Sequence, residues 1–423
     1  MKWIMGITLI FVMVLVSTIV FAQNKPYEGI TVTVISQPRP EWDIIQKYVP
    51  EFEAETGIKV DIKFFAEPER RAKERLDAST GAGVYQVYYM DETNVSEFAS
   101  AGWVLPILDY YPSEYDFDDF MPAWRNIASY EEKPYFAPTV GMGDFLLYRK
   151  DILTEKGFSV PKTLDEYMEE IKKLNDPPTL YGNVTRGTRA TNWWRWGTYF
   201  FAFGGKYLDG DKPVFNSPEA VKAAEYYMEL VKNAPPGCGT YDWGECIEAF
   251  RAGKVAFFID ADVFSDWCED PTKSNVVGKV GYTAPPAGPA GAFSAGATHG
   301  LGISTAGCKT EEIRKSAALF IAWATSKDNE INRIENNVTS SYAGTSTLKS
   351  PQMAEAIPQF LMKALEERAA VTGVTYMRRP EWPEIAEKLG IVLEELLTGT
   401  RTDVKAALDE AVEYATEALT REK

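Results

Sequence analysis

The alternation of apolar and polar positions in the first hundred residues predicts strands and helices in turn. Residues 30–35, 58–65 and 84–90 are short runs rich in β-branched or aromatic side chains, as strands are. Residues 44–56 and 67–78 separate these runs and place apolar side chains at helical spacing. Elements that alternate in this order form a doubly wound, mainly parallel sheet with helices on its faces.

The rest of the chain continues the same pattern with recognisable helix starts. Thr163 with Glu166 three positions later predicts a capping box, and Ser217 before a proline predicts a second helix start. Residues 255–259 form an apolar run that stops at Asp260, which predicts a buried strand. The fold class is therefore α/β throughout.

Three segments rich in glycine, proline or small polar residues are the expected crossings between two lobes: residues 135–144, 288–302 and 340–347. A mature chain of about 400 residues exceeds the size at which a single core stops growing. We therefore expect two lobes joined by hinge crossings. The N-terminal lobe would comprise residues 23–140 and 301–345, and the C-terminal lobe residues 141–300 and 346–423.

The N-terminus has the features of a secretory signal. Lys2 precedes an apolar run over residues 3–21, and Ala22 offers a small residue before Gln23. We expect cleavage after residue 22 and a periplasmic or other extracytoplasmic location. A retained anchor is the alternative, since the run is just short of the roughly 20 residues that span a membrane. No cysteine lies near the cleavage point, so we do not expect a lipoprotein.

Composition excludes several classes of function. The formal net charge of −17 argues against nucleic acid and anionic membrane surfaces as partners. With His299 as the single histidine, no Ser-His-Asp arrangement and no histidine-based metal site is expected, nor any cofactor. The four cysteines fit no zinc spacing. Cys238 and Cys246 are a candidate disulfide, and buried free thiols are the alternative.

Acidic residues follow three of the predicted strands. Glu67, Asp91 with Glu92, and Asp260 lie at strand ends, and open α/β sheets bind ligands outside the carboxyl ends of their strands. Carboxylates there can accept hydrogen bonds from the hydroxyls of a sugar or polyol. The alternative is that these acids cap the helices that come next.

Aromatic residues are unusually dense between residues 193 and 201. The apolar face of a sugar suits an indole ring, so Trp193 and Trp194 are candidate ligand contacts. If this segment is helical, Trp193 and Trp196 share a face and Trp194 points elsewhere, so at least one ring belongs to the core. Several arginines leave an anionic ligand open as an alternative: Arg186, Arg189, Arg195, Arg378 and Arg379.

In order and spacing, six segments resemble the extracellular solute-binding proteins of carbohydrate ABC importers, the class that includes the maltodextrin receptors. The segments are residues 52–60, 102–107, 148–153, 250–260, 318–326 and 380–408. The resemblance covers nearly the whole mature chain and is nearest to the polyol-binding branch. It implies a periplasmic-binding-protein fold and ligand contacts at Trp42, Glu67, Asp91, Asp144, Asp260, His299 and Arg378. The match is loose at Asp144, at His299 and over residues 193–196.

The sequence thus favours a monomeric receptor that captures a small sugar or polyol and delivers it to an ABC permease, without breaking a bond. Two alternatives stay open at this point. One is a receptor for an anionic cyclitol or sugar phosphate, because of the arginines. The other is a secreted carbohydrate-active hydrolase, because the spacing of paired carboxylates cannot be read from a sequence.

Overall fold

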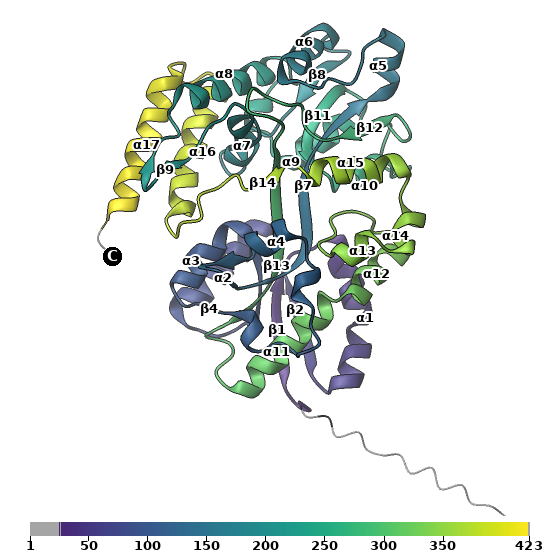
Figure 1. The fold of residues 1–423 in the computed structure, drawn as a ribbon, viewed down its shortest axis with the longest axis vertical. Coiled ribbons are helices and arrows are strands. Elements are labelled where there is room, and N and C mark those ends of the chain that lie inside the picture. The colour runs from purple at the N-terminus through teal and green to yellow at the C-terminus, as the bar shows by residue number, and fades with distance from the viewer. Residues whose placement is uncertain (1–24, 26, 422–423) are drawn as a thin grey trace, which may run out of the picture.

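The computed structural model describes Lys25 and residues 27–421, so the expected signal peptide lies outside the described residues. Figure 1 shows two lobes, one above the other, joined by two long strands that run from the lower lobe into the upper. The lower lobe, which contains β1–β3, is called the first lobe, and the upper lobe, which contains β8, β11 and β12, is called the second lobe. This is the two-lobe α/β architecture that the sequence predicts.

The first lobe is built on a sheet in which β1 (Thr31–Ser36) lies between two parallel neighbours, β2 (Lys59–Phe64) and β3 (Val87–Asp91). Two helices come after β1 and β2 and end at glycines with left-handed backbone, as helix ends favour. They are α1 (Pro40–Thr56) and α2 (Glu67–Thr80). The remaining elements of this lobe are η1 (Glu92–Asn94), α3 (Val95–Ser100), β4 (Val104–Leu105), η2 (Ile107–Asp109), η3 (Phe117–Asp119), α4 (Pro122–Ile127), β5 (Ser129–Tyr130), β6 (Lys133–Pro134), α11 (Glu311–Ala324) and α12 (Lys327–Glu335).

The second lobe has a smaller sheet. In it β11 (Val255–Ala261) pairs parallel to β8 (Tyr181–Val184), and β12 (Val280–Thr283) lies on the other side of the crossing strand β7. The helices around it are α5 (Lys150–Lys156), α6 (Leu164–Leu174), α7 (Asn192–Ala202), α8 (Pro218–Lys232), η4 (Cys238–Thr240), α9 (Trp243–Arg251), α10 (Phe264–Cys268), α15 (Gln359–Ala369), α16 (Trp382–Thr398) and α17 (Val404–Thr420). A hairpin of β9 (Leu208–Asp209) and β10 (Lys212–Pro213) completes it, and β14 (Thr372–Gly373) adds to β13.

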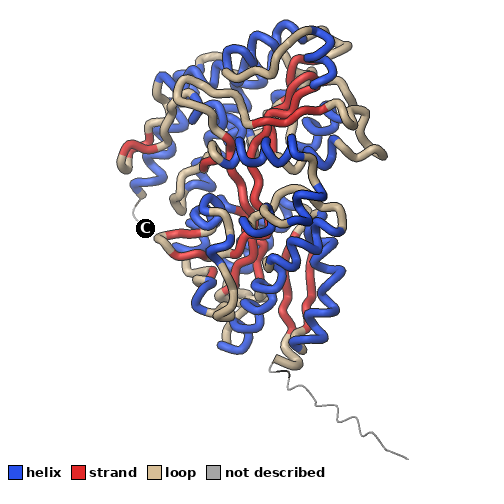
Figure 2. Tube along the Cα trace, turned by 45° about the vertical axis from the view of Figure 1, so that its right-hand side comes forward, coloured by secondary structure: helices blue, strands red, loops and turns tan. Residues whose placement is uncertain are grey.

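Two antiparallel strands carry the chain between the lobes, β7 (Ala137–Arg149) and β13 (Ser294–Ser304). β13 pairs with β3 in the first lobe, and the far half of β7 pairs with β11 and β12 in the second. One sheet therefore continues through both lobes, as the strands in Figure 2 show. In this sheet β1, β2 and β3 pair parallel in the first lobe and β8 and β11 pair parallel in the second. Antiparallel pairing in this sheet involves β7 and β13, and the β5–β6 and β9–β10 pairs outside it are also antiparallel.

Arg333 ties the third crossing to the first. Its guanidinium donates from Nη1 to the carbonyl of Thr139 at 2.8 Å and from Nη2 to the carbonyls of Ser340 and Ser341. The backbone N–H of Gly141 also donates to Ser341. The third crossing is followed by α13 (Thr345–Leu348) and α14 (Pro351–Ala356), which lie beside α12 in Figure 1.

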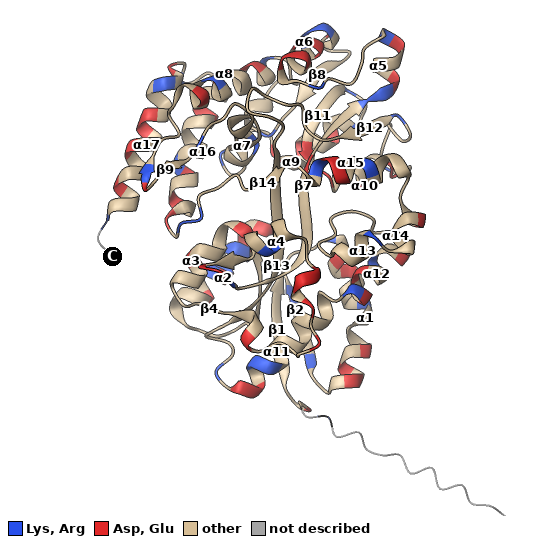
Figure 3. Ribbon diagram, in the orientation of Figure 1, with Lys and Arg blue, Asp and Glu red and all other residues tan. Residues whose placement is uncertain are grey.

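Three apolar clusters fill the lobes, one in the first lobe and two around the second-lobe sheet. The charged residues gather on the outer helices in Figure 3, whereas β13 carries no lysine, arginine, aspartate or glutamate. Within the described residues, no helix is both long and apolar enough to cross a membrane.

The predicted helix starts are confirmed. Thr163 and Glu166 form a reciprocal capping box, and the Ser217 side chain caps α8. The division of the lobes by residue number stays a prediction: its boundaries at residues 140 and 300 fall inside β7 and β13.

Candidate ligand-binding site between the lobes

A cluster of charged residues lies in the first lobe at the carboxyl end of β3, and we call it the first-lobe cluster: Arg70, Arg71, Asp91, Glu92 and His299. The Asp91 carboxylate accepts two bonds from Arg70 Nη2, at 2.7 and 2.8 Å, and one from Arg71 Nε at 2.5 Å. His299 reaches this point from β13, with Nε2 3.6 Å from Asp91 and 3.7 Å from Glu92. The structure therefore brings Asp91 and His299 together, as the resemblance implies.

The pKa values in this cluster diverge. Burial would raise the pKa of Asp91, but Arg70 and Arg71 outweigh burial and hold that pKa well below its ordinary value. Glu92 lacks such a partner, so burial and the neighbouring Asp91 charge raise its pKa to about 8. Burial lowers the pKa of His299 to about 4, with Asp91 opposing the change. At neutral pH the cluster thus holds a charged Asp91, a neutral His299 and a largely protonated Glu92.

Trp42 and Glu67 flank the first-lobe cluster differently. Trp42 is fully buried and packs edge-on against Tyr89, whose ring touches His299 at a centroid distance of 5.5 Å. Glu67 begins α2, keeps about a third of its side chain exposed, and pairs with Arg71 at 2.8 Å. Trp42 is therefore part of the buried wall of the candidate site, and Glu67 lies at its partly exposed rim.

A second group of charges lies in the other lobe, and we call it the second-lobe network: Asp144, Arg186, Trp194, Arg195 and Asp260. Arg195 forks onto Asp144, with Nη2 to Oδ1 at 3.0 Å, and also lies 3.2 Å from Asp260. Arg186 forks onto Asp260 at 2.8 and 2.5 Å. Asp144, Arg195 and Asp260 are fully buried, so this network is a closed set of matched charges.

This geometry corrects one expectation about Asp260. Its carboxylate does end a buried strand, but both oxygens are bonded to Arg186, and Oδ1 also accepts the N–H of Ala261. The two arginines outweigh the effect of burial and lower the pKa of Asp260. Burial raises the pKa of Asp144 despite Arg195. Asp260 is therefore an anchor for arginines rather than a carboxylate open to hydroxyls.

The tryptophan segment is helical, as α7, and its rings divide between core and site. Trp196 is fully buried and stacks on Phe200, so it belongs to the core. Trp193 packs edge-on against Trp382 and donates to the carbonyl of Ala190. Trp194 points to the second-lobe network, with the guanidinium carbons of Arg186 and Arg195 at 4.8 and 4.6 Å from its ring. Of the two candidate ligand rings, the structure places Trp194 among the polar groups.

Arg378 lies on the segment between β14 and α16 and reaches the other lobe. It donates to the Asn126 side chain at 2.7 Å, to the Asn126 carbonyl at 2.6 Å and to the Ser129 carbonyl. Three of its hydrogen bonds are therefore made to the protein, and its role as a ligand contact stays a prediction. Two residues earlier, the buried Tyr376 lies close enough to Glu92 for that charge to raise the tyrosine pKa further than burial does alone.

Buried side-chain polar atoms without a hydrogen-bond partner among the described residues occur in many parts of the molecule. Six of them belong to residues in or beside the two charged groups, at the boundary between the lobes that we call the seam. In the first lobe they are Trp42 Nε1, Glu92 Oε2 and His299 Nδ1, and in the second they are Trp194 Nε1, Thr375 Oγ1 and Tyr376 OH. Each such atom costs roughly 1–3 kcal/mol while it is unpaired. A molecule that carries several hydroxyls could satisfy donors and acceptors on both walls.

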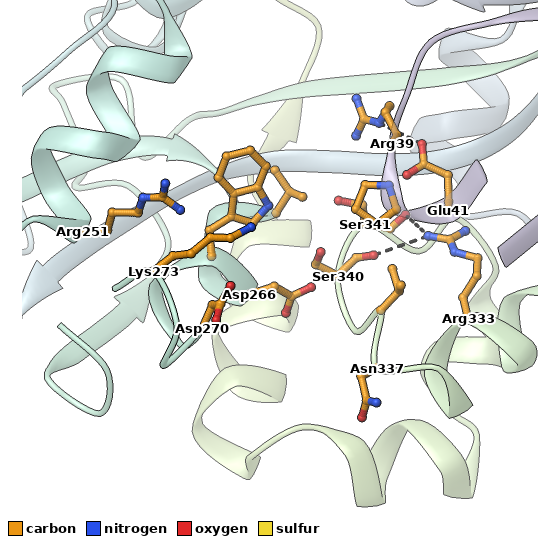
Figure 4. Close-up of a pocket in the computed structure, with 14 residues that line it drawn as sticks. Arg39, Glu41, Arg251, Asp266, Asp270, Lys273, Arg333, Asn337, Ser340 and Ser341 are labelled. Atoms are coloured by element: carbon orange, nitrogen blue, oxygen red, sulfur yellow. Dashed lines mark hydrogen bonds and ion pairs between the residues drawn. The ribbon is translucent and has the colours of Figure 1, made fainter. Parts of the chain in front are cut away.

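A cavity of about 270 Å³ opens beside these groups, between the lobes. Figure 4 shows Arg39 and Glu41 on its first-lobe side, Arg251 and Lys273 on its second-lobe side, and Ser341 of the third crossing between them. None of the nine predicted contacts lines this cavity. It adjoins the first-lobe cluster through Glu41, which pairs with Arg39 at 2.8 Å and accepts the hydroxyl of Tyr89 at 3.1 Å.

Sequence reasoning missed several residues at the seam. Arg368 pairs with Asp262 at 2.9 Å, and both are buried; Arg39, Glu41 and Tyr376 were also overlooked. Asp262 could have been predicted from the sequence, because it comes two positions after Asp260, just past the end of β11. Nothing in the sequence distinguishes Arg368 from a surface arginine.

Of the two states considered for Cys238 and Cys246, the structure has the free thiols and not the candidate disulfide. Cys238 and Cys246 are buried free thiols in the structure, and Cys238 Sγ donates to the carbonyl of Thr185 at 3.1 Å. Burial raises the pKa of Cys238 to about 12, which keeps the thiol protonated and unreactive.

Comparison with known proteins gives a consistent result. Residues 40–331 match the family model described as bacterial extracellular solute-binding protein. The chain is 24% identical over 414 residues to the mannitol-binding protein of Pseudomonas aeruginosa, with 93% of each chain covered. This relative is named as a binding protein and not as an enzyme.

Solved structures agree. A solute-binding protein from Agrobacterium radiobacter in complex with ribitol is 30% identical, with a TM-score of 0.83, covering 93% of this chain and all of that one. Another from Agrobacterium vitis with bound D-mannitol is 27% identical, with a TM-score of 0.79, covering 92% of this chain and 97% of that one. With its family model matched over more than half its length, this chain belongs to the bacterial extracellular solute-binding proteins.

Proposed function

We propose that this protein is the receptor of an ABC importer and that it captures a small, neutral polyol or sugar in the seam between its lobes. The observation that carries the proposal is the set of unpaired buried polar atoms on both walls of that seam. A ligand rich in hydroxyls bonds to both walls at once, and binding then favours the conformation in which the lobes are together.

Charge matching favours a neutral ligand over an anionic one. Six arginines near the seam have a carboxylate partner: Arg39 with Glu41, Arg70 and Arg71 with Asp91, Arg186 and Arg195 with Asp260, and Arg368 with Asp262. Arg333 and Arg378 bond instead to carbonyl and amide oxygens. An anion that bound to any of these six paired arginines would have to displace a buried carboxylate. A hydroxyl ligand needs no such exchange.

The named ligands of related proteins point the same way. Mannitol, ribitol, and erythritol or L-threitol are open-chain polyols, and each is named for a relative of this chain. In our proposal the protein acts outside the cytoplasmic membrane after removal of residues 1–22, as a monomer without a lipid anchor. It then delivers its ligand to permease subunits and catalyses no reaction.

The test is a thermal-shift screen followed by calorimetry, with erythritol, ribitol, mannitol, maltose and inositol phosphates as probes. A neutral polyol at 100 times its dissociation constant should add about 2.7 kcal/mol to the free energy of unfolding. Stabilisation only by the phosphates would contradict the neutral-ligand proposal. Turnover of a glycoside panel would favour the hydrolase alternative instead.

A further inference from the structure

Arg378 joins the two lobes through contacts with main-chain and amide oxygens. Its side chain is exposed, and its guanidinium donates to Asn126 Oδ1, to the Asn126 carbonyl and to the Ser129 carbonyl. None of these acceptors is acidic, so no charge pair holds the arginine in place. The contact depends on the lobes being close together.

Both ends of this contact are anchored in a lobe core. On the arginine side, Tyr376 and Met377 immediately before it are buried in the second-lobe cluster together with Trp382. On the acceptor side, Trp124 and Ile127 of α4 are buried in the first-lobe cluster of apolar residues. The contact therefore joins segments that are each packed into the core of a lobe, not two loose loops.

We propose that Arg378 is an interlobe clasp that stabilises the closed arrangement without touching the ligand. Opening the lobes separates the guanidinium from all three acceptors, so its hydrogen bonds exist only in the closed form. A residue that favours one of two conformations shifts the equilibrium by that difference alone. The clasp rests on the proposed function, because it acts through the closure that accompanies binding.

A clasp and a ligand contact make different predictions. Loss of a clasp lowers the population of the closed form, so it weakens every ligand by the same factor. Loss of a ligand contact weakens ligands unequally, according to the hydroxyl each presents. Arg379 is the matched control: it is the adjacent exposed arginine, but its partner Asp211 lies in the β9–β10 turn of its own lobe.

The experiment compares the wild type, Arg378→Ala, Arg378→Lys and Arg379→Ala. Dissociation constants for erythritol, ribitol and mannitol come from calorimetry, and dissociation rates from tryptophan fluorescence. We expect Arg378→Ala to raise each dissociation constant by one common factor of about 3–10, because an exposed charged contact is worth little more. The change should lie mainly in faster dissociation, and Arg378→Lys should recover part of it. Arg379→Ala should match the wild type.

Two results would overturn the clasp. One is a factor that differs between the polyols, which would make Arg378 a ligand contact. The other is an unchanged dissociation constant and rate. If none of the polyols binds, the proposed function fails, and the clasp is judged separately by small-angle scattering of the ligand-free proteins. In that case Arg378→Ala must have a larger radius of gyration than the wild type and Arg379→Ala, and equal radii would overturn it.

Discussion

The first-lobe cluster and the second-lobe network use the same residue types to opposite ends. In the second-lobe network, Asp144 and Asp260 are each paired with at least one of Arg186 and Arg195, so two carboxylates match two arginines. In the first lobe, two arginines converge on Asp91, while Glu92 beside it keeps an oxygen without a hydrogen-bond partner. Matched charges stabilise a scaffold, whereas an unmatched group at the seam is stabilised by a ligand.

The sharpest test of this contrast is Arg195→Ala. The substitution leaves Asp144 without an arginine partner and Asp260 with Arg186 alone. Both carboxylates are fully buried. Removing one partner of a buried ion pair costs roughly 3–5 kcal/mol. We expect a loss of that size in the free energy of unfolding, measured by denaturant titration at pH 7. A loss below about 1 kcal/mol would show that water reaches the network.

Glu92→Gln tests the unmatched side through pH. The pKa of Glu92 is raised to about 8 in the folded protein, above its unfolded value near 4.3, so the folded state binds its proton more tightly. Its contribution to stability is present below about pH 4 and is lost as the pH rises to about 8.

The variant removes this dependence, so its free energy of unfolding should gain on the wild type as the pH rises from 4.5 to 8. The gain should reach about 2–4 kcal/mol at the upper end. Asp91 and His299 titrate in both proteins, so the difference between the two curves isolates Glu92. Parallel curves would mean that Glu92 is already ionised at neutral pH.

The two tryptophans sharpen the comparison at the level of binding. Trp194→Ala removes the ring against which Arg186 and Arg195 lie, and we expect polyol affinity to fall by about 1–2 kcal/mol. Trp194→Phe should lose less, because it keeps a ring. Trp193 packs on Trp382, and Trp193→Ala should bind within about 0.5 kcal/mol of the wild type. Calorimetry with the tightest polyol from the screen measures all three, and equal losses at both positions would sink the assignment.

The smallest effect is expected at the rim. Glu67 is partly exposed and shares Arg71 with Asp91, so its pair is screened by water. Glu67→Gln should change the free energy of unfolding by less than about 0.5 kcal/mol and the binding free energy by less than about 1 kcal/mol. A larger loss of affinity with unchanged stability would move Glu67 from the rim into the binding surface.

Most of the fold could be predicted because its strands and helix starts depend on residues that are close together in the sequence. Strands β1 and β2 and the capping box at Thr163 depend on neighbours in sequence, and the structure has them within a residue or two of their predicted places. The third strand begins at Val87 rather than residue 84. The continuous sheet through both lobes was not foreseen, because the pairing of β7 with β13 joins segments far apart in sequence.

The site was harder because partners, not residue types, decide what a carboxylate does. Asp260 meets Arg186 across 74 positions, and no local pattern shows that this acid is taken while Glu92 is not. Helical geometry predicted that Trp194 points away from the face of Trp193 and Trp196, but it could not say which of these rings belongs to the core. Sequence reasoning thus named residues of both charged groups, which stay predicted ligand contacts, and could not assign the bonds between them.

Arg333 has a mechanical consequence for the whole molecule. Through Thr139, Ser340 and Ser341 it ties the first and third crossings, and the side chain of Thr298 binds the second crossing to the carbonyl of Val140. Three connectors fastened to one another at the same level cannot swing independently. Hydrogen bonds that join all three connectors therefore oppose any motion that would separate one connector from the others.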